Sequence, residues 1–202
     1  RAKVVINATG VFSDSIQSID DPQHTPSIAP SQGIHIVLDK SFLPGESAIM
    51  IPHTDDGRVL FAVPWHNRII VGTTDTARKE VMAEPRALPE EIDFIMEHAA
   101  RYLTKDPGMA DIKSIFAGLR PLVRANSKRT AELSRDHTII KSDSGLISIV
   151  GGKWTTYRKM AEDVVDTAAG QAKLPEVKCL TDKLPVHGAQ KTSDYNSAYY
   201  YY

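Results

Sequence analysis

The sequence contains a single cysteine, no long apolar run and no surplus of charge of either sign. One cysteine, Cys179, excludes an internal disulfide and a cysteine-rich metal site. The 24 lysines and arginines balance 25 aspartates and glutamates, which argues against a nucleic-acid-binding protein, because such a protein needs basic residues to displace counterions. No apolar run approaches the roughly 20 residues that span a bilayer. The 202 residues, 42% of them hydrophobic, are still enough for one large domain or two small ones.

The two ends of the chain are unusual. Arg1 stands first, and the apolar strand pattern at 4–6 follows almost at once, ending in Asn7-Ala8-Thr9-Gly10. A strand this apolar normally has sheet neighbours on both sides, so we expect the chain to be a fragment of a longer protein. The chain finishes in four consecutive tyrosines, Tyr199 to Tyr202, to which we assign no function.

Alternating apolar residues predict a series of strands through the middle of the chain. Turn-forming segments such as Thr54-Asp55-Asp56-Gly57 separate them. Connections this short favour antiparallel pairing, because a parallel pair needs a crossover of about a dozen residues. We therefore expect a meander sheet with strands at 34–38, 48–51, 59–63 and 68–71, and further strands at 112–116, 120–123, 137–141 and 146–150.

Apolar residues at spacings of three and four predict two helices. The first begins at Pro89, where Glu90 and Glu91 favour the positive N-terminal end of the helix dipole, and it should cover the meander sheet. Its apolar face comprises Leu88, Ile92, Ile95, Met96, Ala99 and Leu103. The second helix follows Gly151-Gly152-Lys153 and ends near Gly170. Its expected buried face comprises Tyr157, Met160, Ala161, Val164, Val165 and Ala168.

These elements predict an α+β fold in which a cap domain is inserted into a partial nucleotide-binding domain. The first strand, the last strand and the helix after the Gly-Gly turn look like parts of a doubly wound, Rossmann-like α/β domain. The antiparallel meander with its covering helix lies between them. The predicted division is 1–30 for the first part of the α/β domain, 31–144 for the cap, 145–175 for the return strand and helix, and 176–202 for a C-terminal extension.

The segment from Ile147 to Arg158 carries the strongest local chemical signal. A strand delivers Gly151-Gly152 to a helix N-terminus, where free N–H groups and the helix dipole attract negative charge. The glycines permit close approach of a flat ligand, and Lys153 adds a cation. Such a site suits a phosphate or the negative edge of a reduced flavin. An ordinary turn with a nearby exposed lysine explains the pattern about equally well.

Arg120 is a charged residue within the otherwise apolar segment 118–122. A partly buried arginine needs an anionic partner, and no acid lies in this segment, so a bound phosphate or carboxylate is a candidate. His35 stands at the start of a strand, where a lone histidine is more often structural than catalytic. We interpret Gly72-Thr73-Thr74-Asp75 as a capped turn. No histidine spacing indicates a metal site.

Four segments, in order, resemble motifs of the FAD-dependent glycerol-3-phosphate dehydrogenases. They are Ser31-Gln32-Gly33-Ile34-His35-Ile36-Val37, Ile70-Val71-Gly72-Thr73-Thr74-Asp75, Gly118-Leu119-Arg120-Pro121-Leu122 and Gly151-Gly152-Lys153-Trp154-Thr155-Thr156-Tyr157-Arg158-Lys159-Met160-Ala161-Glu162. The segment 184–188 is also similar to that family. The resemblance covers about residues 1 to 190.

The resemblance implies a flavoenzyme that oxidises sn-glycerol 3-phosphate to dihydroxyacetone phosphate. A hydride would pass from substrate C2 to flavin N5, and the electrons would then reach membrane quinone. By motif position His35 and Arg120 would be catalytic, and both would contact the substrate together with Lys153 and Arg135. The residues expected to line the FAD are Ala8, Thr9, Gly10, Gly151, Gly152, Trp154 and Thr155.

The sequence also departs from that family. It contains no Gly-x-Gly-x-x-Gly run, the fingerprint that receives the FAD pyrophosphate, and the family's C-terminal helical domain is missing. We therefore expect this chain to bind FAD weakly or not at all and to be inactive by itself. By resemblance we expect a cytoplasmic protein attached peripherally to the membrane. Strand edges exposed by truncation predict self-association.

Two other functions stay open at this point. A glycerol-3-phosphate oxidase, which passes electrons to oxygen, would share the same reductive half-reaction. A non-catalytic cap module that binds an anionic metabolite or a partner subunit is the alternative from another class, and the missing fingerprint favours it. A fingerprint upstream in the complete gene would decide for the enzyme.

Overall fold

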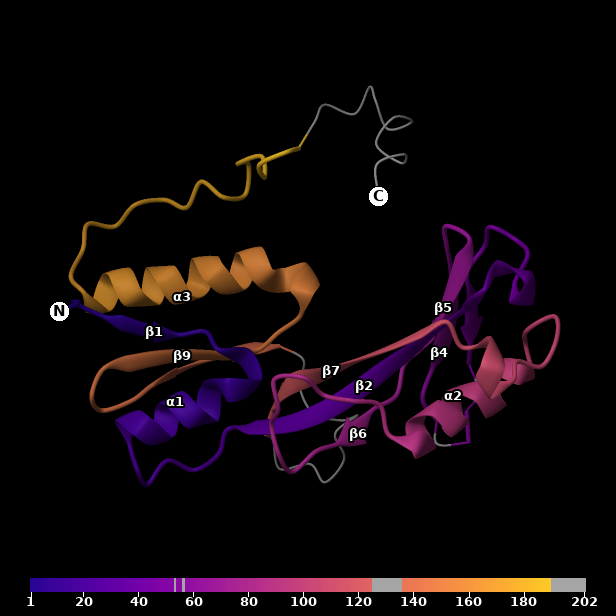
Figure 1. Ribbon diagram of the computed structural model, residues 1–202. Helices are drawn as coiled ribbons and strands as arrows, with labels where there is room; N and C mark the ends of the chain where they lie inside the picture. Colours follow the sequence, from indigo (N-terminus) through magenta and orange to yellow (C-terminus); the bar gives the residue numbers. More distant parts are fainter. Residues whose placement is uncertain (53, 56, 125–135, 190–202) are drawn as a thin grey trace.

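The computed structural model describes residues 1–52, 54–55, 57–124 and 136–189, and these residues form two sheets (Figure 1). The predicted α+β class is confirmed. A small three-stranded sheet has the order β1-β9-β8, and a larger six-stranded sheet has the order β3-β4-β5-β2-β6, with β7 also paired to β2. The long strand β2 starts near the small sheet and runs into the large one (Figure 1).

The small sheet combines the first strand of the chain with its last hairpin. It contains β1 (Val5–Asn7), β8 (His137–Lys141) and β9 (Leu146–Gly151). The helices α1 (Ser13–Asp20) and α3 (Tyr157–Gln171) lie on opposite sides of this sheet (Figure 1). Cover on both faces explains why β9 is apolar and buried along almost its whole length.

Parallel pairing sets the position of the candidate site. β1 runs parallel to β9, with Asn7 opposite Ser148, whereas β8 pairs with β9 in the antiparallel direction. Parallel strands bring their carboxyl ends to the same edge of a sheet. The turn that follows β1 therefore lies at the same edge as the Gly151-Gly152 turn that follows β9.

The large sheet carries its core on one face only. Its strands are β2 (Ile28–Asp39), β3 (Ile49–Ile51), β4 (Leu60–Trp65), β5 (Arg68–Gly72), β6 (Thr76–Ala77) and β7 (Ser114–Val123). The helix α2 (Pro89–Ala100) covers this face with Ile95 and Ala99, as the sequence predicts. These two side chains pack against alternate residues of the strands, among them Ile34, Ile36, Leu38, Leu60, Ala62, Ile69 and Val71.

The other face of the large sheet carries exposed apolar side chains. Phe61 is 46% exposed, Trp65 59% and Phe116 48%. Short 3-10 turns complete the architecture: η1 (Gly10–Phe12), η2 (Lys40–Phe42), η3 (Met109–Asp111) and η5 (Trp154–Thr156). No helix within the described residues is long and apolar enough to cross a membrane.

Several sequence-based boundaries were wrong. One strand, β7, replaces the two predicted at 112–116 and 120–123, because Gly118 keeps its place in the ladder opposite Gly33. The predicted buried face of α3 was too wide, since Tyr157 is 51% exposed and Val165 55%. Only Val164 of that face is fully buried, because the sheet covers a single side of this helix.

The pairing of β8 also differs from the predicted division. The sequence placed the end of the cap after residue 144, yet β8 pairs with β9 in the small sheet. A division by sheet membership would therefore end the cap before His137. The hairpin of β8 and β9 belongs as a unit with β1 and its helices.

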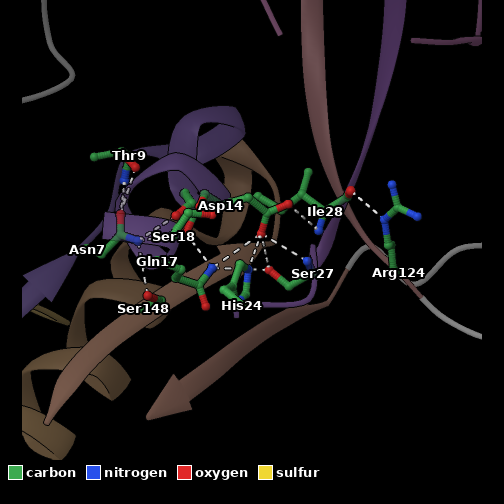
Figure 2. A network of polar contacts seen from close by, with 11 residues as sticks. Asn7, Thr9, Asp14, Gln17, Ser18, His24, Ser27, Ile28, Arg124 and Ser148 are labelled. Carbon is green, nitrogen blue, oxygen red and sulfur yellow. Dashed lines mark hydrogen bonds and ion pairs between the residues drawn. The ribbon is translucent and has the colours of Figure 1, made fainter. Parts of the chain in front are cut away.

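A network of polar contacts joins the small-sheet part to the start of β2 (Figure 2). The Asp14 carboxylate on α1 accepts hydrogen bonds from the Ser27 amide at 2.9 Å, the Ser27 hydroxyl at 2.7 Å and the Ile28 amide at 3.1 Å. The His24 ring lies 3.1 Å from the same carboxylate. Burial would raise the pKa of Asp14, but the hydrogen bonds from Ser27, His24 and Ile28 outweigh it and lower that pKa.

Candidate functional site

Arg120 and His35 lie on the same face of the large sheet, opposite α2. Ser31 pairs with Arg120 across the antiparallel ladder of β2 and β7, so the two side chains project on one face. His35 is four residues after Ser31 on β2 and shares that face, because side chains alternate along a strand. Ile34, the residue before His35, points to the opposite face, into the core under α2.

The Arg120 guanidinium crosses β2 directly above Gly33. A Cβ atom at position 33 would lie 2.2 Å from Arg120 Nη2 and 2.6 Å from Cζ. Real side chains never approach so closely, so the guanidinium occupies the space that any other residue would fill. Gly33, in the first of the four motif segments, therefore leaves room for Arg120, which lies in the third.

On the far side of β2 the guanidinium meets the segment between β5 and β6. Arg120 Nη1 donates to the Thr74 carbonyl at 3.0 Å, and Nη2 donates to the Thr73 hydroxyl at 3.0 Å. The sequence led us to interpret 72–75 as a capped turn and to expect an anionic partner for Arg120. Two of its partners are thus neutral oxygens of this turn, which supports the arginine, and an anionic ligand for Arg120 stays a prediction.

His35 is half-buried beside this arginine. Its ring stacks on Phe116, with the two centroids 5.0 Å apart and the planes inclined by 10°. A Cβ atom at Gly72 would lie 2.4 Å from His35 Cδ2, so glycine is required there too. Burial, and then the positive charge of Arg120, lower the pKa of His35 below its ordinary 6.5. The imidazole is therefore neutral at pH 7 and able to accept a proton.

The Gly151-Gly152 turn ends β9 with two residues at positive φ, 76° and 79°. A Cβ atom at Gly151 would lie 2.6 Å from the Asp136 carbonyl oxygen, and one at Gly152 would lie 2.3 Å from the Met160 sulfur. Protein atoms, and not an open space, therefore fill the room beside both glycines. Their conformation and packing already explain the two glycines, and the close approach of a ligand to them stays a prediction.

Lys153 and Arg120 line one hollow. Its volume is about 300 Å³, and its walls come from 119–122 of β7 and from 151–154 after β9. Lys153 is exposed, and its backbone N–H donates to the Thr156 hydroxyl at 3.1 Å, which fixes the start of the turn. Thr155 is exposed in the same turn. Arg120 and Lys153, which are distant in sequence, thus both contribute to the walls of one hollow, while the Arg120 guanidinium reaches across β2 to Thr73 and Thr74.

Trp154 projects from this turn almost without cover. It is 86% exposed and stacks on the neighbouring Tyr157, with ring centroids 5.5 Å apart. A large aromatic side chain left open beside a hollow is available to a flat ligand.

The turn Ala8-Thr9-Gly10 after β1 is held by Asn7, which is 2% exposed (Figure 2). The Thr9 hydroxyl and amide donate to Asn7 Oδ1 at 2.7 and 3.3 Å. The Asn7 amide nitrogen donates to the Ser148 hydroxyl on β9 at 3.0 Å, which ties the two strand ends together. Gly10 has φ 60°, and the space beside its Cα is open. Sequence reasoning missed Asn7, although a polar residue at the end of an apolar strand was the available signal.

The structure thus brings most of the predicted site residues into two adjoining groups. Arg120 and His35 form the group on the large sheet, and Lys153 and Trp154 lie with the Gly-Gly turn at the edge of the small sheet. Arg135 lies outside the described residues. The strand ends, the open side of Gly10 and the uncovered Trp154 fit the flavin end of FAD. Within the described residues no cluster of histidines, cysteines or acids is arranged to hold a metal ion.

Comparison with protein families gives one match over most of the chain. Residues 1–158 match the family model described as FAD dependent oxidoreductase. The chain is 43% identical over 191 residues to the mitochondrial glycerol-3-phosphate dehydrogenase of Arabidopsis thaliana, covering 93% of this chain and 30% of that protein. It is 45% identical to a probable mitochondrial glycerol-3-phosphate dehydrogenase of Caenorhabditis elegans, covering 99% and 28%. The chain thus spans less than a third of these relatives' length.

Solved structures agree in fold. The glycerol-3-phosphate dehydrogenase of Bacillus halodurans complexed with FAD matches with a TM-score of 0.75 and 38% identity, over 87% of this chain and 34% of that one. The L-α-glycerophosphate oxidase of Mycoplasma pneumoniae matches with a TM-score of 0.59, over 88% of this chain and 44% of that one. Its identity is 17%, so it shows the fold alone. The two curated relatives are named as mitochondrial, and the expected cytoplasmic location finds no support in them.

Proposed function

The chain belongs to the family of FAD dependent oxidoreductases, and from this premise we propose that it forms the substrate-facing part of an sn-glycerol 3-phosphate dehydrogenase. The observation that carries the proposal is the shared hollow of Arg120 and Lys153 beside the ends of the parallel strands. A phosphate ester with two negative charges is the kind of ligand that such a pair of cations selects. Relatives at 43% and 45% identity bear the matching name.

In the proposed reaction the phosphate is held by Arg120 and Lys153, and the C2 hydroxyl lies near His35. The neutral His35 ring accepts the hydroxyl proton as C2 is oxidised to a carbonyl. Arg120, which is close to His35, keeps the imidazole neutral before the reaction and favours negative charge on the substrate oxygen. FAD, when bound, supplies the acceptor for the hydride that leaves C2.

The residues proposed to contact FAD lie at the edge of the small sheet. They are Ala8, Thr9, Gly10, Gly151, Gly152, Trp154 and Thr155. Because the sequence has no Gly-x-Gly-x-x-Gly fingerprint, we propose that these 202 residues alone bind FAD weakly and do not turn over. Transfer of the electrons to quinone and peripheral attachment to a membrane are further parts of the proposal.

A calorimetric titration with sn-glycerol 3-phosphate tests the anion site. The Arg120→Met and Lys153→Met variants should each weaken binding roughly tenfold or more, since each removes a charge-assisted contact. Arg68→Met is the control, because Arg68 pairs with Asp39 at the far end of β5. Glycerol, which lacks the phosphate, should bind to none of the proteins. Equal binding of sn-glycerol 3-phosphate by all variants would refute the anion site. Tight FAD binding by the chain would refute the proposal that these 202 residues alone bind FAD weakly.

A further inference from the structure

A buried acid lies behind the candidate site, on the other side of the large sheet. Glu91 is in the first turn of α2 and is 2% exposed. Its Oε2 accepts from the Leu88 amide at 2.9 Å and from Gln32 Nε2 at 2.6 Å. Its Oε1 accepts from the Thr74 hydroxyl at 3.0 Å. Burial of a carboxylate is costly, and capping a helix needs only one of these three bonds.

Thr74 connects this acid to the arginine on the opposite face. Its hydroxyl points towards α2, where it donates to Glu91 and accepts from the Ile34 amide at 3.1 Å. Its carbonyl points the other way and accepts from Arg120 Nη1. The preceding residue, Thr73, accepts from Nη2 through its hydroxyl. Thr74 thus links the two faces of the sheet, with its hydroxyl bonded to Glu91 and its carbonyl bonded to Arg120.

We propose that Glu91 is a positioning residue that holds Arg120 in place through Thr74. The proposal rests on the proposed function, in which Arg120 contacts the substrate anion. A long arginine side chain loses much rotamer freedom when it is fixed, and a support that is already in place before substrate arrives spares this cost at binding. The carboxylate suits the task because it only accepts hydrogen bonds. A glutamine at this position would replace one carboxylate oxygen by an NH₂ group, which cannot accept a hydrogen bond from any of the three surrounding donors.

Four variants separate the positioning of Arg120 from a general loss of stability. Glu91→Gln removes the acceptor with almost no change of shape, and Thr74→Val removes the hydroxyl in the same way. Thr74→Ser keeps the hydroxyl and should behave as the wild type. Glu90→Gln is the matched charge control, because Glu90 occupies the same first turn of α2 but is exposed.

The first measurement is calorimetric binding of sn-glycerol 3-phosphate to the 202-residue chain. Glu91→Gln and Thr74→Val should weaken it roughly tenfold, while the two controls stay within about twofold of the wild type. The second measurement is the NMR titration of the His35 ring. Arg120 lowers the pKa of His35, so displacement of the guanidinium should raise that pKa towards 6.5. Loss of the Glu91 charge by itself would lower it, and a rise therefore reports movement of Arg120.

The two measurements distinguish the two proposals. If Arg120→Met abolishes binding but Glu91→Gln and Thr74→Val change neither the affinity nor the His35 pKa, positioning by Glu91 is refuted while the function stands. If sn-glycerol 3-phosphate binding is insensitive to Arg120→Met, the proposed function fails, and the titration still shows whether Glu91 holds the arginine. Should Glu91→Gln fail to fold, the Thr74→Val and Thr74→Ser pair decides the question.

Discussion

On the large sheet Arg120 is fixed by Thr73 and Thr74, whereas on the small sheet Lys153 and Trp154 project from their turn into solvent. The large-sheet half of the site is supported from behind by a buried network that ends at Glu91. The small-sheet half has an ordered backbone, held by the Thr156 hydroxyl, but its functional side chains gain little from the fold.

Under the proposed function, this difference reflects the two ligands: the large-sheet half would hold the substrate anion, and the small-sheet half would hold FAD. A side that binds a small anion needs a fixed charge, and two hydrogen bonds from Arg120 to Thr74 and Thr73 hold the guanidinium in this way. The side assigned to FAD leaves an aromatic ring 86% exposed, a cost that a bound flat ring or further chain would offset. The proposed weak binding of FAD by these 202 residues rests on the lack of a Gly-x-Gly-x-x-Gly run within them.

The largest effect is expected when a substitution at another residue displaces Arg120. In Gly33→Ala the new methyl group would collide with the guanidinium, whose flexible end can swing away. We expect sn-glycerol 3-phosphate binding to fall by roughly 2–3 kcal/mol, or about a hundredfold, as for loss of a fixed charge partner. The free energy of unfolding should change by only about 1 kcal/mol, because the backbone at 33 needs no positive φ.

Gly118→Ala is the matched control for this experiment. Gly118 pairs directly with Gly33, yet a Cβ atom there would meet nothing within 4 Å. Calorimetry and urea unfolding should both give wild-type values for it within experimental error. Equal loss of binding in both variants would mean that the ladder, and not the arginine, is sensitive to substitution.

Part of this arrangement was predictable from the sequence. Alternation and short turns predicted the strand 137–141 and the core face of the large sheet, because local apolar periodicity determines both. The sequence also supplied the residue types expected at the site, two cations and a histidine, whose roles stay a prediction. Their approach to one another was not predictable, because β7 and the Gly-Gly turn meet only through tertiary packing.

Glu91 shows what a closer use of periodicity would have added. We assigned it to the helix dipole with Glu90, yet it stands four residues before Ile95 and eight before Ala99, on the buried stripe of α2. An acid on an apolar stripe predicts a buried polar partner. The identity of that partner, Thr74, depended on the route of the chain between β5 and β6, for which the sequence carries no local signal.

A second prediction concerns the joint between the two halves. In Asp14→Asn the network that binds the start of β2 to α1 loses its charged acceptor, and we expect a loss of about 1 kcal/mol in the free energy of unfolding at pH 7. The folded-state pKa of Asp14 is lowered, so its contribution is present above the unfolded value near 3.8 and is lost as the pH falls through the lower, folded value.

Urea unfolding at pH 7 and at a pH below the lowered, folded-state pKa of Asp14 measures both effects. The wild type and Asp14→Asn should converge in stability at the acidic end, while Asp143→Asn, at an exposed position, should match the wild type throughout. A constant difference between wild type and Asp14→Asn at every pH would show that the ionised form of Asp14 is not what holds the joint.

The smallest effect is expected at Trp154, which tests whether the small-sheet half of the site lacks support from the fold. Because this side chain is 86% exposed, Trp154→Ala should change the free energy of unfolding by less than about 0.5 kcal/mol, although it removes the largest type of side chain. Val164→Ala provides the contrast on the following helix: Val164 is 5% exposed and packs on β9, so its truncation should cost about 2 kcal/mol. If Trp154→Ala proved as costly as Val164→Ala in urea unfolding, the ring would be part of the core, and the small-sheet half would be as self-sufficient as the large-sheet half.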